Sequence, residues 1–73
     1  MIHILFAIFD KVARIYLKVV QYRTAEEAKR DFHILKKDKD SVIGKSPSDY
    51  EFHRLGTIDL ETGQIVYGKE VEF

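Results

Sequence analysis

Seventy-three residues without a single cysteine make one small domain that neither a disulfide framework nor a thiolate zinc site stabilises. Hydrophobic residues are 45% of the chain, which is enough for a core and too many for a disordered tail. A chain this short gains stability most simply by sharing core or sheet edges with a copy of itself, so we expect a homodimer. The net charge of zero argues against a strongly basic protein that packages nucleic acid.

The charges are unevenly distributed along the chain. Residues 1–45 hold ten Lys/Arg and six Asp/Glu, whereas residues 46–73 hold two Lys/Arg and six Asp/Glu. If the fold keeps the two parts apart, the domain has a basic and an acidic side. If the fold interleaves them, the surface is neutral, and the sequence leaves both readings open.

The stretch from Ile2 to Phe9 is apolar on both of its alternating faces. This pattern predicts a central strand, or a strand whose second face meets a partner chain. The run is far shorter than the ~20 residues that span a bilayer, and it lacks the basic region and cleavage site of a signal peptide. We therefore expect a soluble protein with no membrane association. His3, inside this run, is expected to be a hydrogen-bonded histidine of the core or strand edge.

A second strand is predicted over Ile15–Arg23, where β-branched and aromatic residues are frequent. An irregular corner at Val12–Arg14 should join it to the first strand. By simple alternation Tyr16, Lys18 and Tyr22 share one face, which would meet solvent or a ligand.

A helix should begin after Thr24, because Thr24 and Glu27 have the spacing of a capping box. Its apolar residues follow a 3-4-3 spacing, which predicts a narrow stripe that packs on one face of the sheet: Ala25, Ala28, Phe32 and Leu35. Basic residues and one histidine lie off this stripe and should form the outer surface: Lys29, Arg30, His33, Lys36 and Lys37.

The loop after the helix holds Val42 and Ile43, which we expect to pack back onto the core, and a short helical turn that starts at Pro47. The clearest hairpin follows, with strands at residues 49–59 and 65–67. Its turn should close with Gly63 in the left-handed region.

Within the first strand of this hairpin, Tyr50, Phe52 and Arg54 share one face. Neither face of the strand is cleanly apolar, which favours an outer strand or one that lies against a partner. Gly56 indicates a bulge or a close approach by another backbone.

No catalytic constellation is evident. The three histidines are too scattered for a spaced metal motif, and the serines have no neighbouring base. Gly44, Lys45 and Ser46 resemble the end of a phosphate-binding loop but lack its upstream glycine. We predict a protein that is not an enzyme and that uses no cofactor and no metal.

Binding of single-stranded nucleic acid has more support, because such proteins combine cationic grooves with aromatic rings that stack on bases. The candidate phosphate contacts are Lys18, Arg23, Lys29, Arg30 and Arg54. The candidate stacking rings are Tyr16, Tyr22 and Tyr50. The alternative is that these rings form ordinary core and cross-strand pairs.

The run Pro47-Ser-Asp49-Tyr50-Glu-Phe-His-Arg-Leu-Gly56-Thr-Ile-Asp59-Leu-Glu-Thr-Gly63 resembles the C-terminal signature of a small nonstructural protein of gokushovirus-type microviruses, which are phages with single-stranded DNA. The helix is similar too, with Ala28-Lys-Arg30-Asp-Phe32 in place of the family's Ala-x-Arg-x-Phe. The resemblance covers nearly the whole chain. It departs at the first corner, between Asp10 and Tyr16, where members often carry Pro or Gly.

The resemblance implies a DNA-binding or replication-associated protein of the host cytoplasm that is absent from the mature particle. It supplies no binding residues. We therefore predict an α+β fold with about four mainly antiparallel strands in the order β-β-α-β-β and one helix on one face of the sheet. The predicted function is single-stranded DNA binding during genome replication or the switch to packaging.

The alternative is an adaptor that acts on a phage or host replication protein or an assembly protein. It would work through an exposed strand edge or the acidic C-terminal segment.

Overall fold

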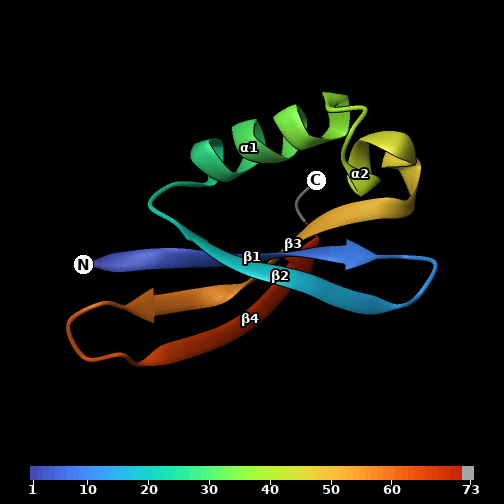
Figure 1. Ribbon diagram of the computed structural model, residues 1–73. Coiled ribbons are helices and arrows are strands. Elements are labelled where there is room, and N and C mark those ends of the chain that lie inside the picture. Colours follow the sequence, from blue (N-terminus) through green and yellow to red (C-terminus); the bar gives the residue numbers. More distant parts are fainter. Residues whose placement is uncertain (72–73) are drawn as a thin grey trace.

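A computed structural model describes residues 1–71 and shows a sheet beneath a helical layer (Figure 1). The elements in chain order are β1 (Ile2–Asp10), β2 (Ile15–Tyr22), α1 (Ala25–Lys37), α2 (Val42–Lys45), a 3-10 turn (Pro47–Asp49), β3 (Tyr50–Asp59) and β4 (Ile65–Val71). The predicted α+β class, with a four-stranded antiparallel sheet and one main helix between the second and third strands, is confirmed.

The strands lie in the order β2-β1-β3-β4. The central position predicted for β1 is confirmed, but the expectation that β3 is an outer strand is wrong, since β3 pairs with both β1 and β4. Phe6 pairs with Arg54 while Leu5 pairs with Gly56, so Leu55 is an extra residue in β3. Such a bulge reverses the face to which later residues point, and this reversal explains why neither face of β3 is apolar throughout.

The N-terminus of α1 is capped as its sequence predicts. The Thr24 hydroxyl accepts a hydrogen bond from the backbone N–H of Glu27 at 3.3 Å. The same hydroxyl lies 3.4 Å from the Glu27 carboxylate, to which it donates. The apolar stripe is also confirmed, because Ala28 and Phe32 are buried and Ala25 and Leu35 pack around them.

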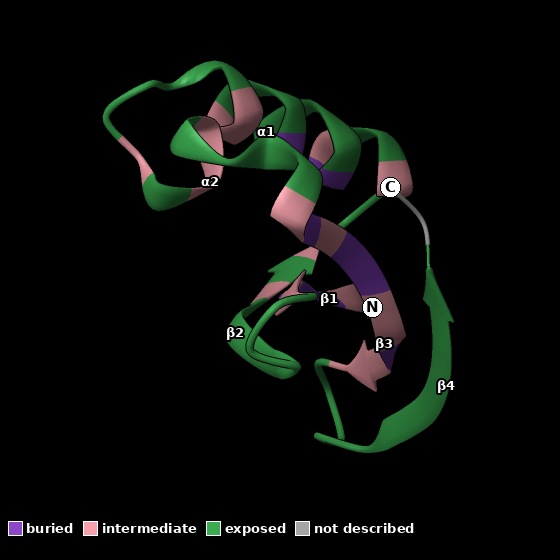
Figure 2. Ribbon diagram, turned by 90° about the vertical axis from the view of Figure 1, so that its right-hand side faces the viewer, coloured by how far each residue is buried: buried purple, intermediate pink, exposed green. Residues whose placement is uncertain are grey.

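The core is built around three phenylalanines, one each from β1, β3 and α1. The Phe52 ring stacks on Phe6 at 5.0 Å and on Phe32 at 4.8 Å between centroids. Tyr22 meets Phe6 edge-on at 5.9 Å. These contacts hold α1 over the middle of the sheet and leave the opposite face of the sheet without a helix (Figure 2).

The two turns follow the chemistry of their residues. At the first corner the Asp10 carboxylate accepts from the N–H groups of Val12 and Ala13, and Arg14 adopts a φ of 60°. In the β3–β4 turn Gly63 has a φ of 77°, as predicted, and its N–H donates to the Asp59 carbonyl at 2.7 Å.

The segment between α1 and β3 departs from the prediction in part. Ile43 packs against the core as expected, whereas Val42 is 65% exposed. The helical turn at Pro47 is confirmed. β4 continues through Gly68 to Val71, beyond the predicted strand, and Glu72 and Phe73 of the acidic C-terminal segment lie outside the described residues.

His3 differs from its expected state. Both of its ring nitrogens are buried, and neither has a hydrogen-bond partner among the described residues. A buried polar group without a partner costs ~1–3 kcal/mol. We predict that His3→Leu raises the free energy of unfolding by about 1 kcal/mol, as measured by urea denaturation; a loss of stability would show that the imidazole forms a favourable contact.

Gly56 shows both features that a glycine inside a strand predicts, a bulge and a close approach by another backbone. It follows the bulge in β3, and its φ is 152°. A Cβ atom at this position would lie 2.1 Å from the Val66 carbonyl oxygen. The approach of β4 therefore requires glycine here.

We predict that Gly56→Ala lowers the free energy of unfolding by more than ~2 kcal/mol, because both the backbone conformation and the contact with β4 are incompatible with a side chain. The matched control is Gly68→Ala in β4, where an added Cβ meets nothing within 4 Å. This control should change stability by less than about 0.5 kcal/mol. Equal effects of the two substitutions in urea denaturation would contradict the close approach of the strands.

Candidate nucleic-acid interface

A bulge in β2 separates the residues that were predicted to share one face. Ala7 pairs with Val19 but Phe9 pairs with Tyr16, so β2 holds one extra residue between these pairs. Tyr16 thereby lies on the face away from α1, while Lys18 lies beside the helix. The predicted shared face is therefore wrong for Tyr16, whereas Lys18 and Tyr22 do lie on one face, around the same hollow.

Tyr22 belongs to the core. Its ring meets Phe6 and Phe52 edge-on, at 5.9 and 6.2 Å between centroids. Burial, together with the neighbouring Asp31 carboxylate and a hydrogen bond to it, raises the pKa of Tyr22 to about 12. The ring is therefore a packing element, as the alternative reading held.

Tyr50 is also unavailable for stacking on a base. It is buried within the hydrophobic core at the start of β3. Burial, followed by the nearby Asp10 and Asp49 carboxylates, raises the pKa of its phenol. Two of the three candidate stacking rings thus support the fold.

Tyr16 is the remaining ring, and it is 38% exposed. It contacts Phe9 at 4.9 Å between centroids, and its hydroxyl lies 2.8 Å from Nδ1 of His53. Nε2 of His53 lies 3.0 Å from the Glu51 carboxylate, and the imidazole stacks on Phe9.

The order of carboxylate, imidazole and hydroxyl in this network is that of a general-base relay. The imidazole, however, is only 4% exposed, and the hydroxyl is a phenol. The evident effect of the network is that both ring nitrogens of a buried histidine have partners. Sequence reasoning missed it, because the β2 bulge that carries Tyr16 to this face left no signal in the residues.

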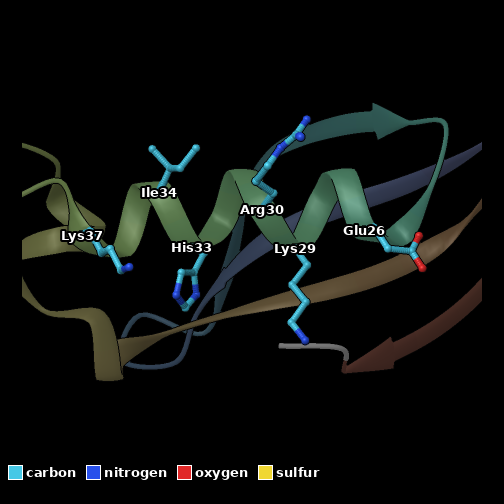
Figure 3. A pocket seen from close by; sticks show the side chains of 6 residues that line it. All are labelled: Glu26, Lys29, Arg30, His33, Ile34 and Lys37. Carbon is cyan, nitrogen blue, oxygen red and sulfur yellow. The ribbon is translucent and has the colours of Figure 1, made fainter.

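The cations are best assembled on α1. Lys29 and Arg30 were predicted site residues, and they lie on the outer face of the helix with two residues that the predicted set lacked, His33 and Lys37 (Figure 3). Together with Glu26 and Ile34 they line a shallow hollow of about 380 Å³. Counted from Glu26, the six lining residues stand at i, i+3, i+4, i+7, i+8 and i+11, a spacing that was a sufficient signal for one helix face.

The other predicted cations are dispersed. Lys18 borders a neighbouring hollow of about 360 Å³ between β2 and α1, where Asp31 also lies. The Nε atom of Arg23 lies 3.4 Å from the Glu27 carboxylate. Arg54 lines a separate hollow between β3 and β4, beside Glu70. Among residues 1–71 the cations are therefore grouped most closely on α1, while the hollow between β2 and α1 combines a single lysine, Lys18, with the rings of Tyr22 and Phe52 and the Asp31 carboxylate.

Among residues 1–71 no group of three His, Cys, Asp or Glu side chains lies close enough to hold a metal ion. In the same part of the chain, no helix has the length and apolar character needed to cross a bilayer.

The fold and this face define a small α+β domain with a basic helix surface. Residues 3–72 match the family model described as phage ORF5 protein, and the chain belongs to this family. No curated protein and no solved structure matches the chain.

The pKa of Tyr22 predicts a pH dependence of stability. The ordinary value is 10.0 and the folded value is about 12, so the unfolded chain loses the phenolic proton first as the pH rises. The free energy of unfolding should fall between about pH 10 and pH 12. Tyr22→Phe should make this decline shallower in urea denaturation, and Asp31→Asn should do so less, because burial is the larger cause. An unchanged slope in Tyr22→Phe would contradict the assignment.

Proposed function

We propose that this phage protein is a non-catalytic single-stranded DNA-binding protein that grips the sugar–phosphate backbone through the outer face of α1. It would act in the host cytoplasm, in phages of the gokushovirus type, during genome replication or the switch to packaging. The observation that carries the proposal is the alignment of Lys29, Arg30, His33 and Lys37 along one exposed helix face.

The form of binding follows from where the aromatic rings lie. Proteins that bind single strands without sequence preference commonly stack bases on exposed rings. Here Tyr22 and Tyr50 are part of the core, and Tyr16 lies on the opposite face of the sheet from α1. Binding would therefore depend on charge, with little contribution from the bases.

The predicted affinity is modest and sensitive to salt. Each phosphate neutralised on a single strand contributes a slope of about −0.7 in log K against log salt concentration. The hollow holds the cations Lys29, Arg30 and Lys37 and one carboxylate, Glu26. The proposal thus predicts a slope of roughly −2 for one protein chain.

A pair of lysine substitutions tests this face. Lys29→Gln with Lys37→Gln should make the salt slope shallower by roughly 1.4 and weaken binding at low salt, because two phosphate contacts are lost. Fluorescence anisotropy with a labelled oligothymidylate across a salt titration measures both quantities.

The matched control is Lys11→Gln with Lys69→Gln, which makes the same change in charge in the first corner and in β4. Its slope should stay that of the wild type. Absence of binding by the wild type at low salt, or equal losses in both double variants, would contradict the proposal.

A second candidate is the protein–protein adaptor, for which the open sheet edges are the supporting observation. β2 and β4 are the outer strands, and every described residue of β4 is exposed. Exposed strand edges accept an additional strand from a partner. Pull-down from infected cells should then recover one partner with and without nuclease, and a partner lost after nuclease treatment would count against the adaptor.

A further inference from the structure

The face of the sheet away from α1, here called the open face, can be assigned residue by residue from the strand register. Odd-numbered residues of β1 point to it, since Phe6 and Ile8 on the other face pack into the core. Each residue paired with an odd-numbered residue of β1 lies on the same face. The pairings give four rows across the sheet: His3–Ile58–Ile65, Gln21–Leu5–Gly56–Tyr67, Val19–Ala7–His53–Val71 and Tyr16–Phe9–Glu51.

Most residues of the open face are apolar, and they extend from one edge of the sheet to the other. Large hydrophobic side chains on its outer strands are well exposed, with Val19 at 56%, Ile65 at 59%, Tyr67 at 70% and Val71 at 60%. Four strands over seven residue positions cover roughly 19 by 23 Å. Such a patch, on the order of 400 Å² even if flat, marks an interaction surface more often than free surface.

The charges on this face limit what can cover it. Among the described strand residues its one cation is Lys69, which by alternation along β4 lies between Tyr67 and Val71 at the edge of the face, so the face offers a single positive charge to a phosphate backbone. Its one acidic residue, Glu51, is within hydrogen-bond distance of His53, which in turn bonds Tyr16. These three polar groups have partners within the chain, so an apolar partner surface would not leave them unpaired; the ring nitrogens of His3, on the same face, are already buried in the single chain.

The size of the chain indicates how the face is covered. The accessible surface is 5097 Å², and a folded monomer of 8.6 kDa is expected to expose about 4,700 Å². The accessible surface is thus near that of a monomer, and a chain this short has only a small core of its own, so burying the face against a second copy would add apolar burial that the single chain lacks. β2 and β4 curve away from the helical layer on the two flanks of the sheet, so the open face is a trough with an unpaired strand at each rim (Figure 2).

We infer that the open face binds the open face of a second copy of this chain. Two troughs placed face to face bring together eight strands, the number at which side chains just fill an enclosed interior. The rims β2 and β4 then lie beside strands of the other copy, which protects edges that would otherwise aggregate. Both α1 helices remain on the outside, so this assembly is independent of the proposed DNA binding.

Two neighbouring residues of β4 provide the test. Ile65 and Val66 are 59% and 60% exposed in the chain, but Ile65 lies on the open face and Val66 on the other. In a monomer, a lysine at either position would change the free energy of unfolding by the same small amount. In the dimer, Ile65→Lys should weaken association at least about a hundredfold because it buries an unpaired charge, whereas Val66→Lys should not.

Sedimentation equilibrium at micromolar to millimolar chain concentration measures the mass. The wild type and Val66→Lys should sediment at twice the chain mass of 8.6 kDa and Ile65→Lys as a single chain with an unchanged far-ultraviolet circular dichroism spectrum. If Ile65→Lys does not fold, Val19→Lys on β2 replaces it with the same expectation. A wild type that is monomeric throughout, or equal dissociation of Ile65→Lys and Val66→Lys, would overturn the inference.

Discussion

The stack of Phe6, Phe52 and Phe32 is the contact on which the rest of the structure depends. It joins the two central strands to α1 with centroid distances of 5.0 and 4.8 Å. Truncation of one buried phenylalanine to alanine costs ~3–5 kcal/mol, which includes both the lost burial and the cavity left behind. The stack fixes which face of α1 points inward and therefore which residues point outward. The basic surface of the helix exists because the opposite surface is committed to these rings.

The packing of aromatic rings into the core also determines how nucleic acid would be bound. Aromatic rings that pack a small core cannot also stack on bases, and a domain of this size has few rings to divide between the two roles. Tyr22 and Tyr50 join the core, so charge is the means left to the chain for the binding of a strand that we propose. The sheet has the opposite character, because its open face is largely apolar and its described strand residues include only two charges, Glu51 and Lys69. Charge on one side and apolar surface on the other separate the two binding functions proposed for the molecule.

Local features were predictable from the sequence because local chemistry determines them. The Thr24 cap, the stripe around Ala28 and Phe32, and the left-handed Gly63 each depend on residues within one or two turns of chain. The α+β class and the central position of β1 followed from periodicity in the same way.

The bulges were the features that the sequence left undetermined. Gly56 indicated one of them without revealing that Leu55 reverses the facing of β3, and the bulge in β2 has no glycine to mark it. Each extra residue inverts the alternation that follows. The bulge in β2 therefore places Tyr16 on the face opposite to the predicted one. The bulge in β3 gives that strand the mixed pattern of an outer strand. His33 and Lys37 were predicted on the same helix surface as Lys29 and Arg30, but they were not chosen as site residues, and the hollow that the four share is seen in the structure.

The most direct test of the central claim compares a single-stranded oligothymidylate with an abasic oligomer of the same length and charge. If the rings support the core and the strand is held by its phosphates, both oligomers bind the wild type with the same affinity at low salt, within about threefold, and with the same salt slope. If the oligothymidylate binds more than about tenfold more tightly, bases stack on the protein, and the assignment of the rings to the core alone is wrong.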